Sequence, residues 1–356
     1  MRELLRALTR REDLNVRYVL YAREAWLDAP LDERFRWRLV SARDPLWHLL
    51  VARCANRHCH AFLSSNSYLT PLFLRIPTVT IVYDLVTFER SMRPNSRSAL
   101  IERATLSLAV RRSAAVIAIS NATAEALNRR LPTEAGKTIV APLGATLPPI
   151  ADLLAEEAAR LPAPGFVLAV GTLEPRKNLP RLVEAYATLA PDLQRRHPLV
   201  VVGAVGWEAE RTLEALRSLQ DRCVMLGYVS DAALSELYRR CAVFCYPSLG
   251  EGFGLPVLEA MTSGAPVITS NLSSLPEVGG EAVEYVDPYD AGSIAAGLRR
   301  VLCDEDHRRR LAELGLARSK QFSWRRFAQM TLDALRRAAQ SPQAQSCDRP
   351  ESRDVR

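Results

Sequence analysis

Short apolar runs separated by helical patterns recur along nearly the whole chain, and they constrain its fold more than any other feature. One series lies between Val16 and Val140 and a second between Phe166 and Val286. Apolar strands that alternate with amphipathic segments are typical of parallel sheets with crossover helices. We therefore expect an α/β protein with two doubly wound lobes that bind ligands in a cleft at the carboxyl ends of their strands. The expected strands are Val16–Tyr21, Phe62–Ser64, Thr78–Tyr83, Ala115–Ile119 and Thr138–Val140, then Phe166–Val170, Leu199–Val202, Cys223–Leu226, Ala242–Tyr246, Val267–Thr269 and Val283–Val286.

The chain is long enough for two such lobes, since its 356 residues suit two domains of about 150 to 200 residues each. Hydrophobic residues make up 48% and charged residues 24%, so each lobe can bury a core. We expect residues 1–149 to form an N-terminal lobe and residues 150–322 a C-terminal lobe, joined through a proline-bracketed Ala/Glu-rich piece at Ile150–Pro164. Residues 323–340 are predicted to form a final helix, and the polar residues 341–356 a disordered tail.

The charge and the cysteines limit the partners and the compartment. A net charge of +7 indicates either a solvated arginine surface or attraction to anionic lipid and charged substrates. The arginine runs lack interleaved aromatic residues, so no nucleic-acid partner is expected. The sequence contains neither a run of about 18 apolar residues nor a secretory leader, and its seven cysteines show no disulfide framework. We therefore expect a cytoplasmic protein, at most peripheral at the inner face of the cell membrane.

A glycine-rich turn with a carboxylate on each side follows the apolar run that ends at Tyr246. In the segment Gly250–Ala260, three glycines let backbone N–H groups approach a ligand, and Pro256 suits the first turn of a helix. A helix N-terminus favours an anion such as phosphate. Glu251 precedes that helix and Glu259 lies inside it, where carboxylates accept hydrogen bonds from sugar hydroxyls or a ribose diol. The alternative interpretation is an ordinary strand, loop and helix with solvated glutamates.

A pair of cations follows the run Phe166–Val170. Arg176 and Lys177 stand at a predicted helix entrance, within the segment Gly171–Asn178. Lysine is scarce, with three among 47 basic residues, so a lysine at this position is notable. Arginine offers a planar fork for phosphate oxygens and lysine a compact charge, so the pair can bind a diphosphate and stabilise it as a leaving group. A solvated helix start is the alternative.

These segments resemble the retaining glycosyltransferases of family 4, which have the GT-B fold of two Rossmann-like domains. The resemblance is specific over residues 165–330 and looser in the first half of the chain. The segments that carry it are Gly171–Asn178, Met225–Asp231, Tyr246–Glu259, Gly264–Ile268 and Pro276–Glu277, and more loosely Pro77–Leu85 and Ala115–Thr123.

The resemblance implies a catalytic role for Arg176, Lys177 and Glu251. The two cations would hold the donor diphosphate, and Glu251 would hold hydroxyls of the donor sugar. Reaction in the family retains the anomeric configuration by a front-face displacement, in which the leaving phosphate helps to deprotonate the acceptor. This reaction requires no enzyme nucleophile, no cofactor and no metal, and the co-substrate is a nucleotide-diphosphate sugar.

Cys54, His58, Cys59 and His60 form a cluster of potential metal ligands in the sequence. Their spacing is not repeated elsewhere as a second ligand pair, so no zinc site is expected.

The resemblance also implies a set of substrate-binding residues. Glu259 would hold the ribose, Tyr228 would lie beside the nucleobase and Leu255 near the phosphates. Many members carry a histidine where this chain has Tyr83, which can also donate a hydrogen bond. The full set is Gly171, Thr172, Tyr228, Gly252, Phe253, Gly254, Leu255, Glu259, Tyr83 and Asp84.

The donor-side residues look most like bacterial members that transfer mannose, rhamnose or related sugars in polysaccharide assembly. We expect GDP-mannose as donor and a glycan or lipid-linked oligosaccharide as acceptor. Two alternatives are a sugar-nucleotide epimerase and a degenerate GT-B protein that binds nucleotide without turnover. Family members open with a strand and a glycine-rich loop, whereas Met1–Leu8 already looks like the helix that follows. Either the start lies upstream of Met1 or this strand is missing.

Overall fold

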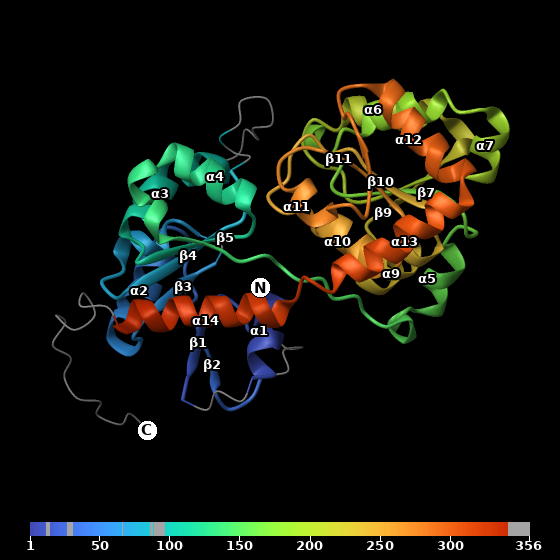
Figure 1. Ribbon diagram of the computed structural model, residues 1–356. Coiled ribbons are helices and arrows are strands. Elements are labelled where there is room, and N and C mark those ends of the chain that lie inside the picture. The colour runs from blue at the N-terminus through green and yellow to red at the C-terminus, as the bar shows by residue number, and fades with distance from the viewer. Residues whose placement is uncertain (12–14, 27–30, 66, 86–87, 89–96, 341–356) are drawn as a thin grey trace.

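The computed structural model describes residues 1–11, 15–26, 31–65, 67–85, 88 and 97–340. Figure 1 shows the chain as two α/β lobes, with the N-terminal lobe on the left and the C-terminal lobe on the right. All strand pairs within the described ranges are parallel. The predicted fold class is therefore confirmed, and the strands expected from the apolar runs differ from the observed ones by at most two residues at an end.

The N-terminal lobe contains a four-stranded sheet and a separate two-stranded sheet. The four strands lie in the order β3-β4-β5-β6, and all five side chains of β4 are buried. The pair β1-β2 includes one strand that we did not predict, because the sequence of β2 alternates with arginines and so gives no apolar run. The bounds are β1 (Tyr18–Ala22), β2 (Phe35–Leu39), β3 (Phe62–Ser64), β4 (Thr78–Val82), β5 (Ala115–Ala118) and β6 (Thr138–Val140).

Helices cover this lobe, and one of them arrives from the far end of the chain. Helix α14 (Trp324–Gln340) packs on α1 and against β4 and β5, as the red helix across the left-hand lobe of Figure 1 shows. Residues of β1, β2, β3, α1 and α14 line a groove of about 1510 Å³. The other helices of this lobe are α1 (Arg2–Thr9), α2 (Leu46–His58), α3 (Arg97–Arg112) and α4 (Asn121–Arg130).

The C-terminal lobe is built on a six-stranded sheet in the order β12-β11-β10-β7-β8-β9. The strand order reverses between β7 and β10, which is the point where doubly wound sheets bind ligands. The strands are β7 (Val167–Val170), β8 (Leu199–Val202), β9 (Cys223–Gly227), β10 (Val243–Tyr246), β11 (Val267–Ser270) and β12 (Glu284–Val286). The helices are α5 (Ala155–Arg160), α6 (Leu179–Ala187), α7 (Pro191–Arg196), α8 (Glu210–Ser218), α9 (Asp231–Arg240), α10 (Leu255–Thr262), α11 (Leu275–Gly279), α12 (Ala291–Cys303) and α13 (Glu305–Ser319).

Two details complete the fold. Asp304 caps α13 by accepting a hydrogen bond from the backbone N–H of His307 at 2.9 Å, as the acidic start of this helix predicts. In the described ranges, no helix is both long and apolar enough to cross a membrane.

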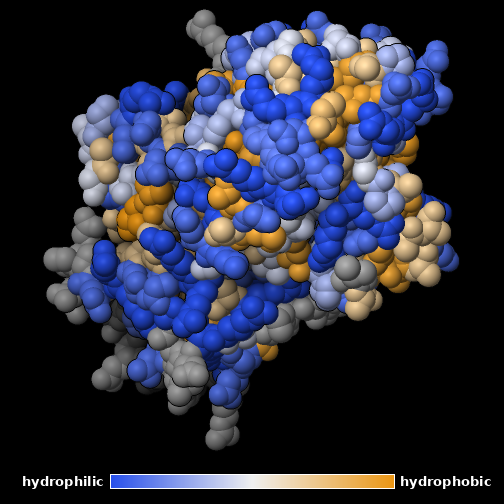
Figure 2. Space-filling view, turned by 45° about the vertical axis from the view of Figure 1, so that its right-hand side comes forward, coloured by the Kyte–Doolittle hydropathy of each residue, from blue (hydrophilic) through white to orange (hydrophobic). Residues whose placement is uncertain are grey.

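Figure 2 shows a face on which hydrophilic residues cover much of both lobes and hydrophobic residues form smaller patches. The expected tail 341–356 lies outside the described residues, and the boundary between residues 149 and 150 stays a prediction.

Candidate active site

The two predicted motifs meet at the switch point of the C-terminal sheet. Strands β7 and β10 are neighbours, and each runs out at its carboxyl end into one of the two motif loops. Arg176 and Lys177 lie in the short 3₁₀ turn that follows β7, and Asn178 ends this turn in the left-handed conformation with φ of 59°. The Asn178 amide donates to the carbonyl oxygens of Pro247 at 3.0 Å and Pro288 at 2.7 Å. These bonds tie the cation-bearing loop to the loop after β10.

Glu251 is the centre of a buried polar cluster. One carboxylate oxygen, Oε1, accepts from Lys177 Nζ at 2.8 Å, from the Tyr246 hydroxyl at 2.6 Å and from Ser248 Oγ at 2.7 Å. The other oxygen forms an ion pair with Arg176. Sequence reasoning missed Tyr246 and Ser248, although both lie in a segment that carries the family resemblance.

The electrostatics of the cluster keep Glu251 ionised. Burial alone would raise the pKa of Glu251, but the charges of Lys177 and Arg176 outweigh burial and the pKa is lowered. Burial lowers the pKa of Lys177, and the charge of Glu251 opposes that effect. Lys177 and Arg176 therefore bring two positive charges to one carboxylate. A second carboxylate is needed to balance them.

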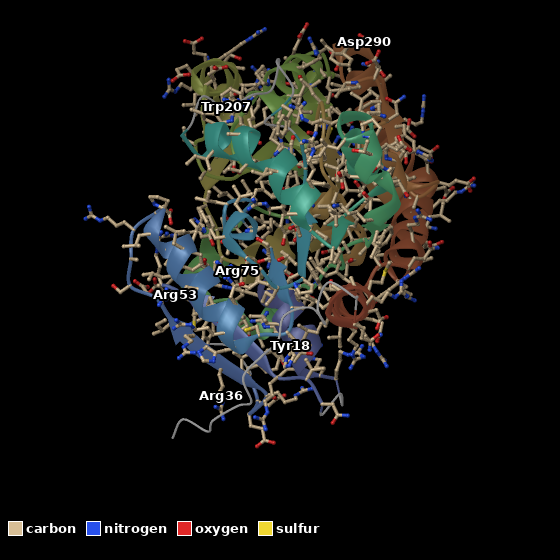
Figure 3. All side chains as sticks on the ribbon, turned by 90° about the vertical axis from the view of Figure 1, so that its left-hand side faces the viewer. Tyr18, Arg36, Arg53, Arg75, Trp207 and Asp290 are labelled. Atoms are coloured by element: carbon tan, nitrogen blue, oxygen red, sulfur yellow. The ribbon has the colours of Figure 1, made fainter. Side chains whose placement is uncertain are left out.

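Glu174 provides this balance, and sequence reasoning missed it. Its Oε1 lies 2.7 Å from Arg176 Nη2, and its Oε2 accepts from the indole N–H of Trp207 at 3.2 Å. Trp207, labelled in Figure 3, belongs to the C-terminal lobe, in the segment after β8. Arg176 is thus held by two carboxylates and also donates to the carbonyl oxygen of Gly250 at 3.0 Å. Two carboxylates, Glu174 and Glu251, thus pair with the two cations.

The glycine-rich loop contacts the N-terminal lobe directly. A Cβ at Gly252 would lie 2.0 Å from the carbonyl oxygen of Tyr83, so any larger residue would force the lobes apart. The carbonyl oxygen of Gly252 accepts from Ser120 Oγ at 2.6 Å and from Thr123 Oγ1 at 3.1 Å. Gly254 starts α10 in the left-handed region with φ of 103°, where glycine is favoured.

Glu277 forms a second contact between the lobes. Its carboxylate accepts from the backbone N–H groups of Asn121 at 2.7 Å and Ala122 at 2.6 Å, which are the first residues of α4. The carboxylate therefore satisfies two unpaired donors at a helix N-terminus in the other lobe. Sequence reasoning did not assign this role, although Pro276–Glu277 was part of the resemblance.

The remaining predicted residues are more spread out. Glu259 on α10 accepts from the Tyr238 hydroxyl at 3.3 Å, and burial raises the pKa of Glu259 to about 7. Tyr228 follows β9 with 82% of its surface exposed. Among the described residues, neither Glu259 nor Tyr228 forms a hydrogen bond or ion pair with the Glu251 cluster. The Phe253 side chain is buried against Phe322, at 5.9 Å between ring centroids, so only its backbone is placed to meet a ligand.

Gly171, Thr172 and Leu255 complete the predicted set. Gly171 lies beside Lys177, since a Cβ there would come within 3.1 Å of Lys177 Cε. Thr172 follows in the same loop and is exposed, while Leu255 begins α10 and packs against the core. In the described part of the chain, no group of three or more His, Cys, Asp or Glu side chains is arranged to hold a metal ion.

A cleft of about 880 Å³ connects this cluster to the first lobe. Arg176 and Glu174 line it from the C-terminal side, and Tyr83 and Asp84 from the N-terminal side. Burial raises the pKa of Tyr83, whose hydroxyl stays protonated at neutral pH. The structure thus brings both first-lobe residues of the prediction to the cleft that Arg176 reaches.

Two lobes built on parallel sheets, with a buried charged cluster at the switch point of the second sheet, match the GT-B fold. Solved structures agree with this class. Sucrose-phosphate synthase from Thermosynechococcus elongatus superimposes with a TM-score of 0.72 at 24% identity, over 94% of this chain and 91% of that one. Anabaena HepE in complex with UDP and glucose superimposes with a TM-score of 0.67 at 20% identity, over 85% of this chain and 86% of that one.

Sequence comparison finds a family and relatives that match the C-terminal lobe. Residues 155–317, less than half of the chain, match the model of the family described as glycosyl transferases group 1. The chain is 42% identical over 174 residues to the O-antigen chain mannosyltransferase B of Escherichia coli. That alignment covers 48% of this chain and 46% of the relative, so the chain matches less than half of the relative's length. Within the C-terminal lobe, these similarities agree with the predicted enzyme class, a glycosyltransferase.

Proposed function

We propose that the protein transfers a hexose, with mannose as the first candidate, from a nucleotide-diphosphate sugar to a glycan or lipid-linked acceptor, with retention of anomeric configuration. The observation that carries the proposal is the buried Arg176–Lys177–Glu251 cluster at the carboxyl ends of β7 and β10. It stands beside a cleft that Tyr83 and Asp84 line from the opposite lobe. Such a cluster suits a ligand that is anionic at one end and polyhydroxylated at the other.

The donor diphosphate would exchange places with carboxylates at the cations. Phosphate oxygens accept the fork of Arg176 and the ammonium of Lys177 at least as well as carboxylates do. Glu251 would then be released from part of its ion pairing and could accept hydrogen bonds from the donor sugar. Glu259 would hold the ribose diol, and the exposed ring of Tyr228 would lie beside the nucleobase. Gly171, Thr172 and Leu255 would border the phosphates.

The chemistry follows from stabilising the leaving group. The bond between the anomeric carbon and the diphosphate oxygen breaks, and the acceptor oxygen bonds to the same face of that carbon. The acceptor hydroxyl gives its proton to the departing phosphate, whose negative charge Arg176 and Lys177 stabilise. This scheme assigns no enzyme nucleophile, cofactor or metal a role.

The proposed sugar and acceptor draw on the relatives. The relative that is 42% identical over 174 residues is named an O-antigen chain mannosyltransferase, which supports mannose and a polysaccharide acceptor. GDP is the nucleotide we propose, although the HepE structure contains UDP. A net charge of +7 would favour a peripheral position at the anionic inner face of a membrane, where a lipid-linked acceptor would lie.

The proposal is tested by mixing the purified protein with GDP-mannose, UDP-glucose and dTDP-rhamnose, with and without short mannose oligosaccharides. We expect GDP release that increases when an acceptor is present, and an α-linked product from an α-linked donor. The Arg176→Ala variant should lose this release. Nucleotide binding without any release would support the alternative of a binding protein without turnover.

A further inference from the structure

Helix α2 exposes leucines on the side that faces away from its lobe. Leu46, Leu49 and Leu50 have 53%, 41% and 40% of their surface exposed. On a helix, residues three and four positions apart share one face, so the same stripe continues through Arg53 and Arg57, which are also exposed. The opposite face is buried in the lobe and carries His48, Val51, Ala52 and Ala55. The helix therefore has an apolar stripe in solvent in addition to the apolar face that it buries.

A second exposed segment lies beside the arginine end of this stripe. The Asn56 side-chain amide donates to the carbonyl oxygen of Phe73 at 3.2 Å, and its oxygen accepts from the backbone N–H of Arg75 at 2.8 Å. Phe73 ends the 3₁₀ turn Thr70–Phe73, and the side chains of Phe73 and Arg75 are exposed. Arg53 and Arg75 also lie near each other in Figure 3. Asn56 thus joins α2 and the turn into one surface.

Helix α3 contributes a cation to the same surface. Its last residue, Arg112, is exposed and donates to the carbonyl oxygen of Leu72, next to Phe73. Both α2 and α3 pack against the turn Thr70–Phe73. We call the combined surface the leucine–arginine patch, and it consists of Leu46, Leu49, Leu50, Arg53, Arg57, Phe73, Arg75 and Arg112.

The arginines of this patch have no carboxylate partner. Residues 45–83, which include α2 and the turn, contain no aspartate or glutamate, although the chain has 40 of them among its 356 residues. In the part of the chain that the structure describes, none of the four arginines forms an ion pair. Asp44, just before α2, pairs with Arg23 at 2.7 Å. The patch is therefore positively charged as well as apolar.

This combination suits the surface of an anionic bilayer. At such a surface, leucine and phenylalanine side chains enter the boundary between head groups and acyl chains. Arginine side chains extend along that boundary and bind lipid phosphates. Each basic residue near an anionic membrane strengthens binding about fivefold. Four arginines without carboxylate partners can all contribute in this way.

The position of the patch favours a bilayer over a protein partner. Leu46 begins the stripe on α2, and the next residue, Trp47, lines the 880 Å³ cleft. On α3, Thr105 lines the same cleft, and Arg112 lies further along the same side of the helix. The patch therefore borders the cleft on the first lobe. A bilayer against this surface would lie beside the cleft, where a lipid-linked acceptor has to enter.

We propose that the leucine–arginine patch docks the first lobe on an anionic lipid bilayer. The three leucines and Phe73 enter the head-group region, and the four arginines bind lipid phosphates. The cleft then opens beside the membrane, and a lipid-linked acceptor reaches it without leaving the bilayer. The assignment rests on the proposed function for the identity of the acceptor, whereas docking itself requires no transfer.

The test is co-sedimentation of the purified full chain with vesicles of phosphatidylcholine alone and with vesicles that also contain phosphatidylglycerol, an anionic lipid. Wild type is compared with Arg53→Gln/Arg57→Gln and with the control Arg211→Gln/Arg217→Gln, which removes two exposed arginines from α8 of the second lobe. We expect wild type and the control to bind the anionic vesicles equally, and Arg53→Gln/Arg57→Gln to bind them about 25-fold more weakly. Wild type should bind phosphatidylcholine alone more weakly, and added salt should weaken its binding to the anionic vesicles.

The leucines are tested separately, because arginines alone would bind by charge. Leu50→Ser should weaken binding to the anionic vesicles about fivefold or more, since an apolar side chain no longer enters the bilayer. Leu154→Ser is the matched control, because Leu154 is 67% exposed just before α5. Equal binding of Leu50→Ser and wild type would contradict insertion of the leucines.

Wild type that stays in solution with anionic vesicles would overturn the assignment, as would equal binding of wild type and Arg53→Gln/Arg57→Gln. Self-association without lipid that the same variant abolishes would assign the patch to contacts between copies of the chain instead. If the double variant does not fold, Arg75→Gln takes its place, with an expected loss of about fivefold.

Thermal stabilisation by GDP is measured on the same proteins and should not depend on the patch. If GDP stabilises none of them, the proposed donor site fails, whereas the vesicle result still decides the docking surface. If GDP stabilises all of them and none binds vesicles, the docking surface fails and the donor site stands.

Discussion

Lys177 and Glu251 form an ion pair 2.8 Å long, although 74 residues separate them in the sequence. Their side chains are only 10% and 9% exposed, so the pair is almost excluded from water. Removing one partner of such a pair leaves a desolvated charge and costs about 3 to 5 kcal/mol when no other partner is present. Arg176 is a second cation for Glu251, which makes the cluster tolerant of losing one charge.

The Lys177→Ala substitution should therefore weaken ligand binding more than it destabilises the fold. We expect the free energy of unfolding to fall by less than about 3 kcal/mol, the lower end of the range for a buried ion pair with no other partner, because Arg176 still pairs with Glu251. We expect the Kd for GDP to rise about tenfold or more, since a charge-assisted contact is lost. Calorimetric titration and thermal unfolding measure the two effects. Lys137→Ala is the matched control, since Lys137 forms a pair with Glu134 in the other lobe. A GDP affinity equal to wild type in Lys177→Ala would contradict the donor site.

The two carboxylates of the glycine-rich segment should have separable roles. Glu259→Ala is expected to raise the apparent constant for the nucleotide, because Glu259 would hold the ribose. Glu251→Ala is expected to reduce transfer more than it reduces binding of free GDP, because Glu251 would act on the sugar. Steady-state kinetics together with GDP titration distinguish the two. The reverse pattern would exchange the roles of Glu251 and Glu259.

Glu259 should make two properties depend on pH. As pH rises, the free energy of unfolding should decrease and the affinity for GDP should increase. Its pKa of about 7 lies above that of an unfolded glutamate, so its stabilising proton is lost as pH rises through 7. Without nucleotide, Glu259→Gln should therefore be more stable than wild type at pH 8, by the order of 2 kcal/mol, and similar to wild type at pH 4. GDP affinity of wild type should fall as pH decreases from 8 to 6, because the Glu259 carboxylate, which would accept the ribose hydroxyls, becomes protonated. Parallel pH profiles for wild type and Glu259→Gln would contradict this account.

Glu277 should hold the two lobes together through α4. The Glu277→Ala substitution removes the acceptor of the Asn121 and Ala122 amides, which costs about 1 kcal/mol by analogy with helix caps. We expect faster hydrogen exchange at the first turn of α4 and a larger radius of gyration in solution scattering. Glu281→Ala is a suitable control, since Glu281 is exposed two residues beyond α11. Unchanged exchange at Asn121 and Ala122 would show that the contact does not hold the lobes.

Local patterns predicted most of the fold, and their failures have physical causes. Buried parallel strands such as β4 and β8 read as apolar runs because both of their faces are covered. Strand β2 was not predicted, because Arg36 and Arg38 interrupt its apolar residues on a partly exposed sheet. The sequence identified Arg176, Lys177 and Glu251 as separate motif residues.

Local patterns could not predict contacts between segments that are distant in the sequence. Glu174 appears in the sequence as one more glutamate, and only the fold shows that it shares Arg176 with Glu251. Glu277 is a similar case, because only the fold brings its carboxylate to the backbone N–H groups of Asn121 and Ala122.

The central claim is that the Arg176–Lys177–Glu251 cluster binds the diphosphate of a sugar donor. The most direct measurement is the thermal shift of the purified protein with GDP, UDP, dTDP and ADP, for wild type and Arg176→Ala. A ligand at about 100 times its Kd stabilises a protein by about 2.7 kcal/mol, which is readily seen. We expect one diphosphate, with GDP as the first candidate, to stabilise wild type and to have little effect on Arg176→Ala. Folded wild type that responds to none of the four, or a variant that responds as wild type does, would contradict the claim.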